Sequence, residues 1–198
     1  MSNIQTTAQS TNTMTETAEG ANIEGESQQF LTFILDDEAY GVEILRVQEI
    51  KGWTPVTRIP NTPEYMQGVL NLRGTIVPIV DMRMRFKLKH VEYTPITVVI
   101  VLSVKSESGE RVIGLVVDSV SDVIDVAAQD VKPTPDFGTS LNTKFINGIA
   151  TSNDTMVMLL DVDKLLSVEE MSVLSQMSES GAHLSKEETA AISQGEGS

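Results

Sequence analysis

The chain has 198 residues, of which 40% are hydrophobic, and a formal net charge of −14, so it can bury a core but suits nucleic-acid phosphates poorly. It contains no cysteine, which excludes disulfides and cysteine chemistry, and no window approaches the roughly 18 unbroken apolar residues of a membrane span. We therefore expect a cytoplasmic protein without direct membrane insertion and without a nucleic-acid partner.

Both ends of the chain differ in composition from the middle. Residues 1–28 contain glutamates but no Lys, Arg or aromatic residue, and residues 179–198 are similarly polar. Such segments bury too little apolar surface to offset the entropy of ordering. We expect two disordered tails, the first one acidic, around a folded body of residues 29–178.

The body consists mainly of short β-rich segments separated by turn residues. Their close spacing is typical of an all-β barrel or sandwich. Nine segments are candidate strands: FLTFIL, YGVEI, VQEIKGW, GVLNL, TIVPIVDM, ITVVIVL, RVIGLVVD, FINGIA and TMVMLLDV.

Helix signals are few. Thr62 before Pro63 resembles an N-cap with proline in the first turn, which predicts one helical turn over PEYM. Ser167 with Glu170 forms a capping-box pattern, which predicts a C-terminal helix over residues 167–178.

A weak internal duplication organises the body. LTFIL matches VVIVL at an offset of 67, YGVEILRVQEI matches IGLVVDSVSDV at 73, and GVLNLRGTIVPIVDM matches GIATSNDTMVMLLDV at 80. The growing offset is consistent with longer loops in the second copy. We read two pseudo-repeats of about five strands, residues 29–90 and 91–166, which favours two small packed barrels.

The duplication also gives a structural reading of two aspartates. Asp81 and Asp161 occupy equivalent positions at strand ends, which would suit a paired acid and base. Each, however, precedes a short helical pattern, where aspartate caps the free backbone amides of the first turn. We therefore expect both to be N-caps.

Signals for metal binding and catalysis are poor. Asp118, Asp122 and Asp125 lack the spacing and central glycine of a calcium loop. His183 lies in the expected C-terminal tail, so a hydrolase would depend on His90, which has no nucleophile elbow to accompany it. We expect no enzyme, cofactor or metal site.

The run DMRMRFKLKH has two possible forms. As a strand, it would present Arg83, Arg85, Lys87 and Lys89 on one basic face, the alternative that would make this a nucleic-acid-binding protein. As a helical turn after Asp81, it would place Met82 and Phe86 on one face. The equivalent segment VDKLL favours the turn, with the basic residues as a solvated rim.

Arg73 stands out against its equivalent in the second repeat. Both copies run seven residues from Gly68 or Gly148 to the threonine, so the turns align without gaps. The second turn centres on Asn153 and Asp154, which tight hairpins prefer, whereas the first centres on Arg73 and Gly74. Because a turn does not need arginine, we expect Arg73 to bind a carboxylate or to stack on a partner.

Four segments resemble the CheW family of bacterial chemotaxis coupling proteins. These are YGVEILRVQEI, RIPNTPEYMQGVLNLRGTIVPIVDMRMRF, GLVVDSVSDVIDV and MVMLLDVDKLL, and the resemblance covers about Phe30 to Met171. It implies a CheW-like domain over residues 29–178 with two packed, five-stranded SH3-like barrels. It also implies a non-enzymatic scaffold that links chemoreceptor cytoplasmic tips, in membrane receptor clusters, to the regulatory domain of the histidine kinase CheA.

The resemblance further implies which residues bind partners. Val47, Glu49 and Arg73 match interaction positions of the family, and Val98 with Val99 matches a strand that helps to form its groove. Gly68 and Gly74 match structural positions beside the site. Without a phosphotransfer or receiver segment around the domain, we expect a stand-alone adaptor. The alternative is an adaptor of a related pathway, such as twitching.

Overall fold

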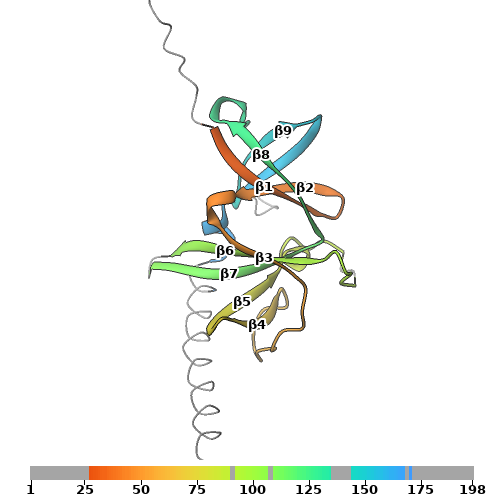
Figure 1. Ribbon diagram of the computed structural model, residues 1–198, viewed down its shortest axis with the longest axis vertical. Helices are drawn as coiled ribbons and strands as arrows, with labels where there is room; N and C mark the ends of the chain where they lie inside the picture. Colours follow the sequence, from red (N-terminus) through yellow and green to blue (C-terminus); the bar gives the residue numbers. More distant parts are fainter. Residues whose placement is uncertain (1–26, 90–91, 107–108, 135–143, 168–169, 171–198) are drawn as a thin grey trace, which may run out of the picture.

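The computed structural model describes residues 27–89, 92–106, 109–134, 144–167 and 170 (Figure 1). Most of the expected tails, His90 and most of the expected helix over residues 167–178 lie outside these ranges. The first strand begins at Ser27, so the last two residues of the expected N-terminal tail belong to a strand.

Ten strands form the described fold: β1 (Ser27–Leu35), β2 (Glu38–Glu43), β3 (Val47–Gly52), β4 (Met66–Leu72), β5 (Thr75–Asp81), β6 (Val98–Ser106), β7 (Gly109–Val117), β8 (Ser119–Ala127), β9 (Ile146–Ser152) and β10 (Thr155–Leu160). Short helical turns connect them: η1 (Ile44–Arg46), α1 (Met82–Arg85), η2 (Ala128–Asp130) and η3 (Val162–Lys164). The all-β prediction is confirmed, although β8 was not among the nine predicted strands. Only Asp118 separates β8 from β7, so no turn signal marks its start.

The strands form two curled five-stranded sheets of equivalent order. Barrel I has the order β8-β1-β2-β10-β9, and barrel II has the order β3-β6-β7-β5-β4. The two orders become identical when each strand is replaced by its equivalent in the other repeat, so that β1 corresponds to β6, β2 to β7, β8 to β3, β9 to β4 and β10 to β5. Figure 1 shows barrel I above barrel II, and neither is built from one repeat alone. The parallel pairs β2 with β10 and β5 with β7 join strands of different repeats.

Alternate residues of the same strands fill three apolar cores. In β6, Val99 and Val101 point into barrel II, whereas Ile100 and Leu102 join the large core between the barrels. In β1, Phe30 lies in the core of barrel I and Phe33 in the shared core. Because these strands are buried on both faces, they read as continuous apolar runs.

The predicted caps are largely confirmed. Asp81 Oδ1 accepts the amide of Met84 at 3.1 Å, and Asp161 Oδ1 accepts that of Asp163 at 3.1 Å. Ser167 and Glu170 form the reciprocal capping box, with bonds of 2.6 and 3.2 Å.

The predicted Thr62 cap is wrong. The Thr62 hydroxyl donates to the Ile59 carbonyl, and the segment forms a turn closed by the bond from Met66 N to Pro63 O at 2.8 Å. Because residues 63–66 form this turn and no helix, Thr62 has no first helical turn to cap.

Candidate protein-interaction site

The β4–β5 turn holds its two central residues in the left-handed region. Arg73 has φ 52° and Gly74 has φ 88°, and Asn153 and Asp154 in the equivalent turn have φ 47° and 62°. Positive φ at both positions is the signature of the two-residue type I′ hairpin. Gly74 N also donates to Asn71 Oδ1 at 2.8 Å, which braces the loop.

This backbone conformation is unfavourable for arginine. A non-glycine residue pays about 1–2 kcal/mol there, and asparagine tolerates the region better because its short side chain bonds locally. The side chain of Arg73 is nonetheless 87% exposed. The strain is not offset by burial, which makes this turn a candidate functional position.

An ion pair of Arg73 spans two edges of barrel II. Arg73 Nη2 lies 3.2 Å from Glu49 Oε2, and Glu49 is on the edge strand β3. The pair borders a pocket of about 200 Å³, lined by Gln48, Glu49, Leu72, Arg73, Thr75, Val77, Val101 and Val112. The pocket thus has an apolar floor with a carboxylate and a guanidinium at its rim.

Gly68 allows the two edges of barrel II to meet. Thr57 and Val69 exchange backbone hydrogen bonds of 3.0 and 2.9 Å beside it. With φ 141°, a Cβ on Gly68 would lie 2.1 Å from the Thr57 carbonyl oxygen. Gly148 faces Val131 and Lys132 in the same way in barrel I. Gly68 therefore has a closure role: it permits the close backbone contact with Thr57 that closes barrel II.

The valines suggested by the resemblance lie in different environments. Val47 and Val98 are half-buried against the shared core, at opposite ends of the β3–β6 pairing. Val99 is 1% exposed inside barrel II, where it cannot touch a partner in this structure. Of the predicted site residues, the structure brings together Glu49, Arg73 and Gly74.

Some pocket residues escaped the sequence reasoning. Val101, not Val99, lines the pocket and pairs with Glu49. A register shift between Val47 and Glu49 sets this pairing, and one residue of register exchanges the two faces of a strand. The alternation of side chains between the two faces of the strand ITVVIVL could have identified Val101 as a pocket residue. That alternation, however, does not show which face of the strand borders the site.

The basic run is not the solvated rim that we expected. Arg83 binds Asp118 and Asp36, and Arg85 donates to the Leu165 carbonyl at 2.7 and 3.0 Å. Asp118 raises the pKa of Arg83. Two of the four cations are thus committed to contacts within the fold, which removes the basic face required by the nucleic-acid alternative.

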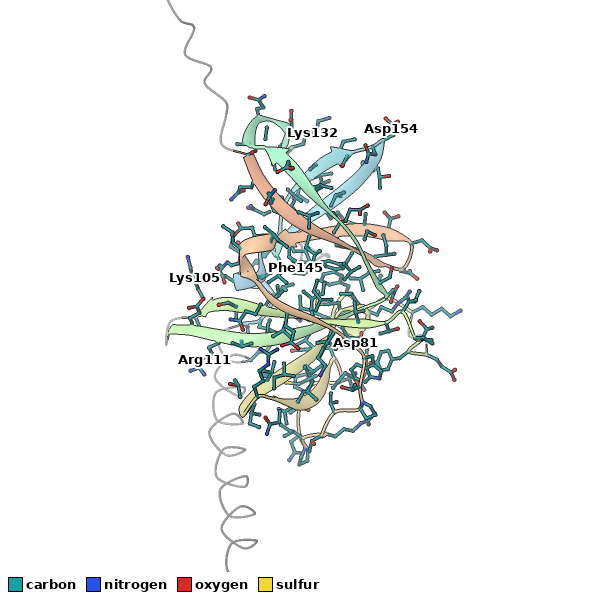
Figure 2. The ribbon with its side chains drawn as sticks, in the orientation of Figure 1. Asp81, Lys105, Arg111, Lys132, Phe145 and Asp154 are labelled. Atoms are coloured by element: carbon teal, nitrogen blue, oxygen red, sulfur yellow. The ribbon has the colours of Figure 1, made fainter. Side chains whose placement is uncertain are left out.

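The remaining polar groups have structural partners. Asp81, labelled in Figure 2, is 2% exposed and accepts the Tyr93 hydroxyl at 2.6 Å. Burial and this carboxylate raise the pKa of Tyr93. Among the described residues, no cluster of His, Cys, Asp or Glu could hold a metal ion. Within the same ranges, no helix is long and apolar enough to cross a bilayer.

The fold consists of two barrels that exchange strands, and the candidate site is a pocket with Arg73 at its rim. Asp81 and Asp161 are helix caps and not an acid–base pair. These features define a β-barrel adaptor domain. The CheW-like domain family matches residues 29–170. The chain belongs to the CheW family, whose members are non-catalytic chemotaxis scaffolds. It is 47% identical over 153 residues to "Chemotaxis protein CheW" of Klebsiella aerogenes, covering 77% of this chain and 90% of that protein.

Further comparisons agree with this assignment. The chain is 40% identical over 143 residues to "Chemotaxis protein CheW" of Rhizobium meliloti, covering 72% of this chain and 90% of that protein. The crystal structure of scaffolding protein TtCheW from Thermoanaerobacter tengcongensis matches with a TM-score of 0.65 and 30% identity. That match covers 73% of this chain and 97% of the solved one.

Proposed function

We propose that this chemotaxis scaffold binds chemoreceptor cytoplasmic tips and the regulatory domain of the histidine kinase CheA at the same time. We further propose that Arg73 and Glu49 contact one of these partners. The observation that carries the site assignment is the exposed Arg73, kept on a strained turn where its equivalent is Asn153. The proposal places the chain at membrane receptor clusters.

The pocket indicates the chemistry of that partner. Leu72 and Val112 are half-buried and offer an apolar surface beside the buried Val77 and Val101. The planar guanidinium of Arg73 can bind a carboxylate through two parallel hydrogen bonds. We expect an apolar side chain to enter the pocket beside an acidic residue of the partner. Burial would supply most of the affinity, and the charges would set the register.

A reconstituted mixture of receptor tip, kinase and this protein tests the assignment through kinase activity. Arg73→Ala is expected to keep the native circular-dichroism spectrum and to lose receptor control of the kinase. Arg58→Ala is the matched control, because Arg58 is exposed in the same half of the molecule, away from this pocket. Unchanged kinase control with Arg73→Ala would reject the site.

The scaffold role has its own test. The wild-type protein, mixed with purified kinase and receptor tip, should capture each partner separately in a pull-down. Capture of neither would reject the proposed partners whatever the behaviour of Arg73. The alternative of a related chemosensory pathway is tested by exchanging the receptor for one of that pathway.

A further inference from the structure

Two partly buried arginines hold the two barrels together outside the shared apolar core. The first is Arg83, in α1 after β5 of barrel II. Its Nε and Nη2 bind Asp118 at 2.6 and 2.5 Å, and its Nη1 binds Asp36 and the Lys89 carbonyl at 3.0 Å each. Asp36 lies in the β1–β2 turn of barrel I, and its amide donates to Asp118 at 2.9 Å.

The second arginine, Arg46, makes the corresponding connection elsewhere on the seam. It lies in η1, where the chain passes from β2 of barrel I to β3 of barrel II. It pairs with Asp163, in η3 after β10, and donates to the Ser103 carbonyl of β6 at 3.4 Å. Asp163 Oδ1 also accepts the Lys105 amide of β6 at 2.6 Å.

The two clusters are equivalent in position and opposite in polarity. Arg83 and Asp163 each follow a capping aspartate by two residues, Asp81 or Asp161. Their partners, Asp118 and Arg46, each lie in the connection that crosses from one barrel to the other. Both clusters therefore bridge the barrels at equivalent crossings.

Apolar packing and these clusters constrain the barrels in different ways. Burial of apolar area is non-directional, so the shared core resists separation of the barrels more than a change of their angle. An arginine with several bonds has a fixed planar geometry and resists such a change. The side chains of Arg83 and Arg46 are 12% and 16% exposed, so solvent screens their bonds little.

We infer that Arg83 and Arg46 are positioning residues: they set the angle between the barrels, and hence the placement of the Arg73 pocket of barrel II relative to a second partner surface on barrel I. The inference rests on the proposed function, because a scaffold that binds two partners at once needs a fixed spacing between them. A loss of geometry would leave each separate contact intact and weaken simultaneous binding.

The binding test uses Arg83→Met and Arg46→Met, with the exposed Arg58→Met as the matched control. Titration with the receptor tip alone and with the kinase regulatory domain alone should give affinities within about twofold of wild type. Assembly of the three-component complex should weaken by roughly tenfold or more. Arg83→Lys keeps the positive charge but lacks the planar, forked guanidinium, so it should restore part of the three-component assembly.

A distance measurement separates positioning from simple loss of stability. The chain has no cysteine, so Lys105→Cys in β6 of barrel II and Asp154→Cys in the β9–β10 turn of barrel I accept spin labels selectively (Figure 2). Both positions are exposed. Arg83→Met should broaden or shift the distance distribution by pulsed electron resonance at a temperature where circular dichroism remains native.

The outcomes are decisive in each direction. An unchanged distance with unchanged three-component assembly in both arginine variants overturns the inference. Equal weakening of separate and simultaneous binding does so too, since it assigns the arginines to general stability. If Arg83→Met does not fold, Arg46→Met and the single-arm variant Asp36→Asn carry the test. Failure of the wild-type protein to bind either partner rejects the proposed function instead.

Discussion

Replacing Arg73 with asparagine should separate the conformational cost of arginine in the β4–β5 turn from the role of arginine in partner binding. In the left-handed region arginine costs about 1 kcal/mol more than asparagine. Against this gain stands the loss of the Arg73–Glu49 pair, worth about 0.5 kcal/mol because Arg73 is 87% exposed. The net expectation is a stabilisation of about 0.5 kcal/mol.

The order of three variants makes this prediction sharp. For a chain of this size, about 0.5 kcal/mol raises Tm by about 1–2 °C. Arg73→Ala keeps the backbone cost and loses the pair, so its Tm should fall slightly below wild type. Thermal unfolding followed by circular dichroism should therefore rank asparagine first, arginine second and alanine third.

The equivalent turn supplies the control. Asn153→Arg introduces the same side chain at φ 47° in the second repeat, where Asp122 is the residue equivalent to Glu49. The conformational cost of about 1 kcal/mol, reduced by at most about 0.5 kcal/mol if an exposed pair with Asp122 forms, should lower the free energy of unfolding by about 0.5–1 kcal/mol. A drop in Tm for Arg73→Asn would show that arginine is there for stability, and our account of this turn would be wrong.

Three further predictions concern stability. Gly68→Ala should destabilise the fold by about 3 kcal/mol or more, because the new Cβ would lie 2.1 Å from the Thr57 carbonyl oxygen. The loss should appear as a lower urea midpoint of unfolding, and an unchanged midpoint would contradict the closure role of Gly68. Tyr93→Phe should cost about 1–2 kcal/mol by leaving one Asp81 oxygen unpaired, and it can be followed by fluorescence of Trp53, whose ring centroid is 4.2 Å from that of Tyr93. Burial and Glu170 raise the pKa of Tyr65 from 10.0 to about 12, so the folded state retains a proton that the unfolded state loses. Stability should therefore fall as the pH rises from about 10 towards 12, and Tyr65→Phe should reduce this slope in denaturant titrations at each pH.

The duplication predicts the fold better than it predicts the partners of each strand. It identified equivalent strands, and the equivalent sheet orders confirm them. It did not show that each barrel takes strands from both repeats, because an offset says which residues correspond and not which copies pair. The separation of β5 from β7 in sequence hides that contact from any local pattern.

The site shows a similar division. Arg73 was identifiable because Asn153 supplied an internal comparison, and tight-turn chemistry acts over a few residues. The ion pairs and partial burial of Arg83 were not identifiable, because Asp36 and Asp118 lie far from it along the chain. Without those partners, a run of alternating cations is indistinguishable from a solvated face.

The reversed polarity of the two arginine clusters has a consequence for the route by which the barrels assemble. If each repeat folded on itself, β5 would lie beside β2 and β10 beside β7. Arg83 would then face Arg46, and Asp163 would face Asp118. Each such contact at about 4 Å is repulsive by about 4 kcal/mol at an effective dielectric of about 20. Like-charge repulsion therefore disfavours a barrel made from one repeat alone. The opposite charges of the observed pairs favour barrels in which each repeat pairs with strands of the other.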